Sequence, residues 1–213
     1  MATSLRRTRE RDIIDSARAA FDERGVQEAA MEEIARSVGI NRALIYRYFE
    51  SKDELFVLTV TRYLDELTAR GIERIDLAAP PVEQLRVSWA NFTSYCREYP
   101  AFLDCALSLM RQPAADLRQR VSERTWFRLG ESMSACLAVT IDVLRRGVEA
   151  GAFRIADPTL TANCMYAQTL GMMHLARTGI AVGRRADEAS TVSPQEVEEE
   201  CIRAALAAVG VYA

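Results

Sequence analysis

The stretch MEEIARSVGINRALIYRYF, which runs from Met31 to Phe49, predicts two short helices joined by a tight turn. Apolar residues recur at helical spacing in its first half and give one helix a buried face: Met31, Ile34, Ala35 and Val38. Gly39 ends that helix because glycine adopts a left-handed backbone at little cost. Asn41 then provides a good N-cap for the second helix.

The second helix has one face that turns back toward the first and one that turns outward. Ile45 and Phe49 point back, and the outward face carries little acid; it consists of Arg42, Leu44, Tyr46 and Arg47. A glycine turn between two such helices is typical of the helix-turn-helix arrangement, whose second helix lies in a DNA major groove. On spacing alone, an ordinary helical hairpin inside a bundle is equally compatible with the stretch.

The residues that follow resemble a known family. The sequence YFESKDELF, from Tyr48 to Phe56, is similar to the junction after the recognition helix in the TetR family of bacterial repressors. Ile34-Ala35, Val38-Gly39-Ile40 and Leu44-Ile45-Tyr46 resemble the family as well. The resemblance runs from about Arg9 to Phe56, and the rest of the chain matches only in its helical character and length.

The resemblance implies an all-α homodimer that binds a double-stranded, (pseudo)palindromic DNA operator. A ligand in the C-terminal helices would change the separation of the two recognition helices, which must stay about one DNA turn, ~34 to 36 Å, apart. We expect Arg42 and Arg47 to read bases or contact phosphates. Tyr46, Tyr48 and Lys52 are expected mainly to contact the DNA backbone. The full set of residues expected at DNA is Arg6, Arg7, Asn41, Arg42, Ala43, Leu44, Tyr46, Arg47, Tyr48 and Lys52.

Three positions depart from the family pattern. Ala30 stands where a threonine commonly caps the second helix and contacts phosphate, so a cap worth ~1 kcal/mol is expected to be missing. Ala43 replaces a usual glycine, which puts close approach of the backbone to DNA in doubt. Leu44 replaces a usual small polar residue and would contact a thymine methyl group instead of making a hydrogen bond.

Composition restricts the class of protein. The chain has 213 residues, of which 49% are hydrophobic and 27% charged, enough for a sizeable core. No run of 18 apolar residues occurs and the N-terminus lacks the apolar region of a secretory signal, so we expect a cytoplasmic protein with no membrane partner. The net charge of −3 argues against coating nucleic acid by bulk attraction, although arginines are concentrated in the first eleven residues.

The sequence shows no pattern of a catalytic, metal or cofactor site. Five cysteines lie far apart without a CxxC pair, and His174 is the single histidine, so metal-ligand spacing is missing. We expect these cysteines to be reduced thiols in the core. There is no GxSxG motif and no phosphate-binding glycine loop. We therefore expect a protein that is not an enzyme and has no cofactor.

About nine helices are predicted along the chain, divided into a DNA-binding domain (1–50) and a ligand-binding and dimerisation domain (51–213). The first helix ends near Arg24, and a long fourth helix begins at a capping box formed by Ser51 and Glu54 and runs to about Gly71. Pro80-Pro81 marks the next boundary, and a short helix over 101–110 and one long helix over 116–150 are predicted after it. A further helix starts at an N-cap at Asp157-Pro158. After a loop over 181–192, the last helix starts at a second capping box, Ser193 to Glu196.

The last two helices are predicted to form the homodimer. The helix after Pro158 is apolar nearly all round and must be buried on two sides, one of them against a second copy. The face of small residues on the final helix suits close packing, with Val197, Cys201, Ala204, Ala205 and Ala208 on it. An Ala205→Arg substitution would then disturb the dimer.

A mostly apolar pocket for a hydrophobic small-molecule effector is expected in the C-terminal domain, with methionine and aromatic walls that adapt to such ligands. The residues expected to line it are Trp89, Phe92, Cys96, Phe102, Met110, Trp126, Met133, Met165 and Met172. Stripes of this kind are also typical of plain core. The alternative function is a helical ligand-binding or interaction protein without DNA-regulatory activity.

Overall fold

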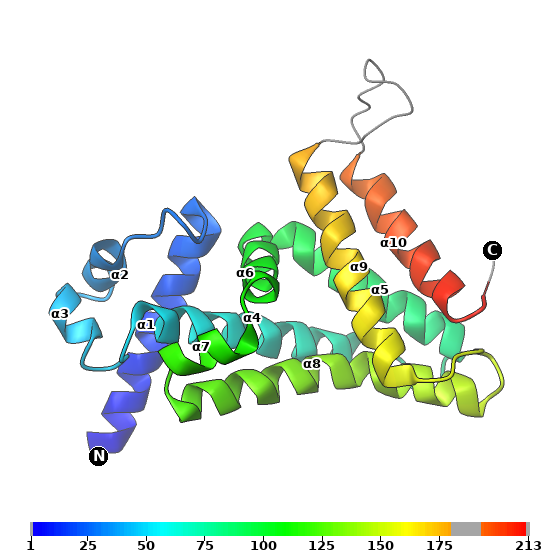
Figure 1. Cartoon of the computed structure of the whole chain (residues 1–213), viewed down its shortest axis with the longest axis horizontal. Helices are drawn as coiled ribbons and strands as arrows, with labels where there is room; N and C mark the ends of the chain where they lie inside the picture. The colour runs from blue at the N-terminus through cyan, green and yellow to red at the C-terminus, as the bar shows by residue number, and fades with distance from the viewer. Residues whose placement is uncertain (1, 180–192, 212–213) are drawn as a thin grey trace. The chain divides into compact units, whose positions relative to one another are not determined.

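The computed structural model describes residues 2–179 and 193–211, and within these ranges it contains helices and no strands. Figure 1 shows their order along the chain. The helices are α1 (Ala2–Arg24), α2 (Met31–Ser37), α3 (Arg42–Ile45), α4 (Lys52–Arg74), α5 (Pro81–Glu98), α6 (Pro100–Arg111), α7 (Ala114–Arg120), α8 (Glu123–Glu149), α9 (Pro158–Thr178) and α10 (Pro194–Ala208). The all-α fold class is confirmed.

The chain packs as two compact units that do not coincide with the predicted boundary after residue 50. One unit takes in Met1–Glu66 and Tyr99–Ser134, and the other takes in Leu67–Glu98 and Ala135–Ala213. We refer to them as unit 1 and unit 2. This is a division by packing, and the functional division into 1–50 and 51–213 stays a prediction.

Unit 1 begins with α1, α2 and α3 around a small shared core. Ile13 and Ala17 of α1, Ile34 of α2, and Ile45 and Phe49 around α3 are all buried there. The predicted end of the first helix is confirmed, because Gly25 follows Arg24 with φ of 85°. Gly39 likewise has φ of 69° in the turn between α2 and α3, so both turns use the left-handed conformation that glycine tolerates.

At the start of α4, only one of the two hydrogen bonds of the predicted capping box is present. Ser51 Oγ accepts a 3.0 Å hydrogen bond from the Glu54 amide as expected. The Glu54 carboxylate, however, accepts from the Glu50 amide at 2.5 Å and from the hydroxyl groups of Ser122 and Thr125. The side chain is drawn to these two hydroxyl donors, which come from a distant part of the sequence. The helix itself also runs past Gly71 to Arg74.

The single helix predicted over 116–150 is wrong, because the structure breaks it into α7 and α8. Val121 between them has an extended backbone with φ of −128° and ψ of 156°. Ser122 then starts the new helix, since its Oγ accepts from the Thr125 amide at 3.3 Å while donating to Glu54. The break also explains why there are ten helices in the described residues instead of nine.

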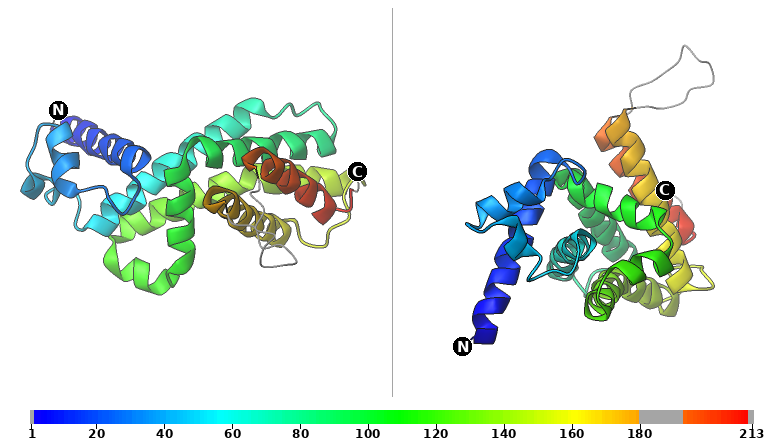
Figure 2. Two further views of the ribbon diagram at one scale, coloured as in Figure 1. Left: turned by 90° about the horizontal axis from the view of Figure 1, so that it is seen from above. Right: turned by 60° about the vertical axis from the view of Figure 1, so that its left-hand side comes forward.

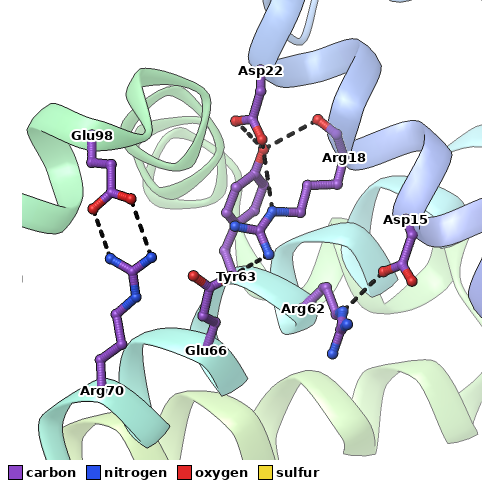
Figure 3. A network of polar contacts seen from close by, with 8 residues as sticks. All are labelled: Asp15, Arg18, Asp22, Arg62, Tyr63, Glu66, Arg70 and Glu98. Atoms are coloured by element: carbon purple, nitrogen blue, oxygen red, sulfur yellow. Dashed lines mark hydrogen bonds and ion pairs between the residues drawn. The ribbon is translucent and has the colours of Figure 1, made fainter.

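Polar contacts join α1 to the first part of α4 inside unit 1 (Figure 3). The Tyr63 hydroxyl donates a 2.7 Å hydrogen bond to Asp22 Oδ1, and Arg62 pairs with Asp15 at 2.9 Å. Arg18 lies 4.5 Å from the centre of the Tyr63 ring and also pairs with Glu66. Burial and the neighbouring Asp22 raise the pKa of Tyr63, so its hydroxyl group stays a donor. These contacts fix α1 on α4.

Unit 2 is built on α5, α9 and α10. Figures 1 and 2 show α9 and α10 side by side, and both helices also contact α5. The predicted N-cap of α9 is confirmed, because Asp157 accepts from Thr159 and Leu160, and so is the capping box of Ser193 and Glu196 on α10. The predicted loop over 181–192 lies outside the described residues. Within unit 2, Arg70 forms a two-point ion pair with Glu98, which Figure 3 also shows.

The expectation that all five cysteines lie in the core is wrong for one of them. Cys96, Cys105 and Cys201 are buried and Cys136 is half-buried, but Cys164 is exposed on α9. Burial raises the pKa of the Cys201 thiol to about 11, so it is protonated at neutral pH. No helix among residues 2–179 and 193–211 is both long and apolar enough to cross a membrane.

Candidate functional site

The first candidate site is the surface around α3. The Asn41 side chain accepts a 2.9 Å hydrogen bond from the Leu44 amide and so caps this short helix. Ile45 and Phe49 are buried in the core shared with α1 and α2 and so hold α3 in place. This leaves Arg42, Ala43, Tyr46 and Arg47 exposed on the outer side, with Leu44 and Tyr48 half-buried and Lys52 exposed at the first position of α4.

Arg42 forms an ion pair with an acidic residue, Glu32, that was not predicted from the sequence. Its Nη1 pairs with Glu32 Oε1 at 2.6 Å, and its guanidinium lies 5.7 Å from the centre of the Tyr46 ring. Hydrogen bonds from the Glu32 backbone amide and from Arg42 lower the pKa of the Glu32 carboxyl group, so it is charged at neutral pH. The expectation of an outward face with little acid therefore needs correction.

The N-terminal part of α1 adds more arginine beside this surface. Arg6 pairs with Glu10 at 3.0 Å and lies 5.9 Å from the centre of the Tyr48 ring. Arg9 donates to the Val38 carbonyl at the end of α2 at 3.3 Å, and Arg7 is exposed. Arginines that are exposed next to tyrosines are suited to phosphate contacts, because their positive charge can reach the DNA backbone.

The predicted loss of a cap at Ala30 agrees with the structure. Ala30 occupies the N-cap position of α2 and makes no side-chain hydrogen bond there. The first turn of α2 carries Glu32 and Glu33, which interact favourably with the helix dipole but repel DNA. The N-terminus of α2 therefore lacks the hydroxyl group that could bind both a backbone amide and a phosphate.

The second candidate site is a cavity in unit 2 of about 40 Å³. Its apolar and aromatic walls include Trp89, Phe92, Val139 and Tyr166. The remaining lining residues carry no formal charge and are two leucines and seven small or polar residues: Leu67, Leu137, Thr68, Gly71, Ser88, Asn91, Cys136, Thr140 and Ala162. By volume it holds a small molecule or a few waters.

Only two of the residues predicted to line a pocket contribute to this cavity, namely Trp89 and Phe92. Phe102 is a fully buried core side chain of unit 1, packed 6.0 Å from the Tyr63 ring. Met110 and Met133 are 53% and 44% exposed, so they lie on the surface. The others also lie outside the cavity: Cys96, Trp126, Met165 and Met172.

The residues that sequence reasoning missed are mainly small or polar. Asn91, Ser88 and Thr140 lie on the inner side of α5 and α8, where all three are buried. Their positions in the sequence gave a usable signal, because Ser88 and Asn91 interrupt an otherwise apolar helix face. A polar residue on a buried face needs a partner, and a cavity next to it can hold one.

The third feature is the outer face of α9. Leu160 and Leu175 are 61% and 45% exposed, unusual for leucine in a helix that packs on others. Cys164, Ala167 and Gly171 lie between them at helical spacing and are exposed as well. One of the two faces of this helix that were predicted to be buried is therefore left uncovered by the described residues of one chain. Ala205 and Cys201 of α10, by contrast, are buried inside the protomer.

The geometry defines the class of protein: a helical helix-turn-helix protein with an exposed basic surface and a separate cavity. Comparison with known proteins agrees. The sequence family "Bacterial regulatory proteins, tetR family" matches residues 13–58. The "HTH-type transcriptional repressor KstR2" of Mycobacterium tuberculosis is 27% identical over 166 residues, covering 75% of this chain and 74% of that protein. The regulator HbdR of Aromatoleum sp. is 31% identical over 137 residues, covering 61% and 58%.

Solved structures show the same fold. RolR in complex with resorcinol has a TM-score of 0.71 at 18% identity, covering 98% of this chain and 90% of that one. FadR of Bacillus subtilis in complex with stearoyl-CoA has a TM-score of 0.68 at 17% identity, covering 93% and 98%. Residues 13–58 therefore match the tetR family of bacterial regulatory proteins, and the fold is that of solved TetR-family regulators.

Proposed function

We propose that this regulator is a homodimeric repressor that binds a (pseudo)palindromic operator and is released by a small molecule. The observation that carries the proposal is the exposed outer side of α3, where Arg42, Tyr46 and Arg47 stand on a helix capped by Asn41 and anchored by Ile45. Arg47 and Arg42 would contact bases or phosphates in the major groove, and Lys52 would contact a phosphate at the start of α4.

The proposed dimer uses the outer face of α9. An uncovered stripe of Leu160, Cys164, Ala167, Gly171 and Leu175 offers apolar side chains at both ends and small ones in the middle. Small residues let two helices approach closely, and a two-fold axis would bring the same stripe of a second copy against it. Because a large apolar surface is seldom left in water, a second copy is its natural partner.

The names of similar proteins support the proposal that this protein represses transcription and responds to a small molecule. KstR2 is named a repressor, and RolR and FadR carry resorcinol and stearoyl-CoA in their crystal structures. In this chain the cavity of unit 2 is the candidate effector site. An effector need only favour a dimer with a different spacing of its two α3 helices to weaken operator binding.

The experiment is selection of DNA from a pool of randomised duplexes, followed by transcription from a promoter that carries the selected sequence. We expect an inverted repeat whose half-sites lie one helical turn or a multiple of it apart, ~10 to 10.5 base pairs per turn. We also expect purified protein to reduce transcription from that promoter. Enrichment of an inverted repeat with increased transcription would support operator binding and overturn repression.

The second candidate is a ligand-binding protein without regulatory activity. The observation in its favour is the ion pair of Glu32 with Arg42, which places negative charge on the DNA-facing surface. Failure of any sequence to be enriched, in protein that still binds small molecules, would favour this candidate over the repressor.

A further inference from the structure

One buried amide oxygen beside the cavity of unit 2 lacks a hydrogen-bond partner. Asn91 is only 4% exposed, and its Oδ1 accepts no hydrogen bond from any described residue. Asn91 is also one of the residues that line the cavity. Buried polar atoms in folded proteins are nearly always hydrogen-bonded, so an unpaired oxygen beside an open space indicates a place for a ligand or water.

Three other polar side chains of the cavity wall, Ser88, Trp89 and Thr140, have hydrogen-bond partners. The hydroxyl groups of Ser88 and Thr140 lie 3.2 Å apart and bond to each other. The Trp89 indole Nε1 donates to Thr169 Oγ1 at 3.0 Å. Asn91 Oδ1 is a buried acceptor beside the cavity that stays open to a bound molecule.

The walls exclude a charged molecule. The residues that line the cavity include no aspartate, glutamate, lysine, arginine or histidine. An ionised carboxylate, phosphate or ammonium group would lose its water there without gaining a counter-ion, which is very unfavourable. Aromatic rings form one wall, with Trp89 and Phe92 centred 5.6 Å apart and Phe92 and Tyr166 5.5 Å apart. Such a wall suits another flat ring.

We propose that the cavity binds a small, uncharged aromatic molecule with a hydroxyl group, and that this hydroxyl group donates a hydrogen bond to Asn91 Oδ1. The ring would pack against Trp89, Phe92 and Tyr166. A hydroxyl group can both donate and accept, so it pairs with the amide in either orientation of the side chain. The inference rests on the proposed function, because it names the class of effector for the same cavity.

Gly71 keeps the space next to the amide open. A methyl group at this position would lie 3.4 Å from Val139 Cγ1 and 3.7 Å from Asn91 Nδ2, which are ordinary contact distances. Alanine therefore fits Gly71 without a clash but fills part of the space between α4, α5 and α8. Gly130, also within a helix, has nothing within 4 Å of such a methyl group, and so Gly130→Ala is a matched control away from the cavity.

The test measures binding of three probes to the full chain by calorimetry: phenol, anisole and benzoate. Anisole blocks the donor of phenol with a methyl group, and benzoate adds a charge. We expect phenol to bind, anisole to bind at least about tenfold more weakly, and benzoate not to bind. Equal binding of phenol and anisole, stronger binding of benzoate, or no binding of phenol would each overturn the proposal.

Variants test the residues themselves. Asn91→Leu should weaken phenol binding at least about tenfold while the free protein keeps or raises its Tm, because the substitution removes an unpaired buried oxygen. Gly71→Ala should also weaken phenol binding, whereas Gly130→Ala should bind like wild type. An Asn91→Leu protein that binds phenol normally would contradict the role of the amide.

The same preparations also separate this inference from the proposed function. Binding to the selected operator is measured without any probe present. A protein that binds the operator but not phenol overturns the effector class alone. A protein that binds phenol but no operator overturns the repressor and leaves the cavity site standing.

Discussion

The hydroxyl group of Thr125 donates a 2.6 Å hydrogen bond to Oε1 of Glu54. The two residues are far apart in sequence, and the bond joins the first turn of α8 to the first turn of α4 within unit 1. Ser122 donates to the same carboxylate, and Ser51 at the start of α4 donates to the Arg120 carbonyl at 2.9 Å. The junction directly after α3 is therefore fixed to the start of α8 within unit 1.

Glu54→Gln tests this junction through the pH dependence of stability. Burial would raise the pKa of Glu54, but hydrogen bonds from Ser122, Thr125 and the Glu50 amide outweigh it and hold the pKa below the ordinary value of 4.5. A lowered folded pKa means that the charged group stabilises the protein above pH 4.5 and that this contribution is lost as the pH falls through the folded pKa.

We expect Glu54→Gln to reduce the free energy of unfolding at pH 7 by about 1 to 3 kcal/mol, because two hydroxyl donors lose a charged acceptor. The variant should then lose less stability than wild type on acidification, as measured by urea unfolding across the acid range. Glu131→Gln, at an exposed glutamate of α8, is the control. Parallel pH curves for wild type and Glu54→Gln would show that the carboxylate is not stabilising.

Ala30→Ser should stabilise the protein. A serine at the N-cap of α2 would accept a hydrogen bond from a backbone amide of the first turn, which is worth about 1 kcal/mol. Chemical denaturation measures the effect. Ala19→Ser, at an exposed position inside α1, is the control and should be slightly destabilising. Equal effects at the two positions would show that the missing cap is unimportant.

Arg42→Ala and Glu32→Gln should change DNA binding in opposite directions. Loss of Arg42 removes either a base contact, worth ~1 to 3 kcal/mol, or a phosphate contact, which lowers the salt slope by about one. Glu32→Gln removes the negative charge that pairs with Arg42 at 2.6 Å and should therefore tighten binding. Fluorescence anisotropy at several salt concentrations separates the two roles of Arg42. Weaker binding of Glu32→Gln would show that the ion pair orients Arg42 for DNA.

Ala167→Arg should break the dimer. The substitution places a long charged side chain in the middle of the exposed α9 stripe, where a second copy would leave no room for it. Sedimentation should give the monomer mass of 23.8 kDa for the variant and twice that mass for wild type. Ala69→Arg, at an exposed position of α4, should leave the dimer intact. A monomeric wild type, or a dimeric Ala167→Arg, would refute the interface.

Ala205→Arg, the substitution suggested by the sequence, is a poor test of the dimer. Ala205 is buried within the protomer, so an arginine there would disturb α10 packing and unfold the chain before it reached a partner. Small residues do face outward at Ala167 and Gly171 of α9, and on α10 at Ala208. The periodicity correctly marked both faces as apolar but could not tell which of them α5 and α10 cover.

Features set by neighbouring residues could be predicted from the sequence. Gly25 and Gly39 follow helices with positive φ, and Asn41, Asp157 and Ser193 cap helices with their own side chains. Each depends on a few residues of local chain, which is the range over which capping and turn chemistry act.

Features set by distant residues could not be predicted in this way. The break between α7 and α8 depends on Ser122 meeting Glu54, and the pairing of Arg42 depends on Glu32 in another helix. The cavity depends on Gly71, Asn91 and Tyr166 from three helices, so an apolar stripe on one helix pointed to the wrong lining. Tertiary contacts decide these features.

The most direct test of the central claim is the ratio of two DNA affinities at physiological salt. One duplex carries the selected inverted repeat, and the other carries the same bases with both half-sites scrambled. A sequence-specific regulator that reads DNA through α3 should bind the first duplex at least ~10³-fold more tightly. Equal affinity for the two duplexes would mean that the protein is held by charge alone and would contradict the account.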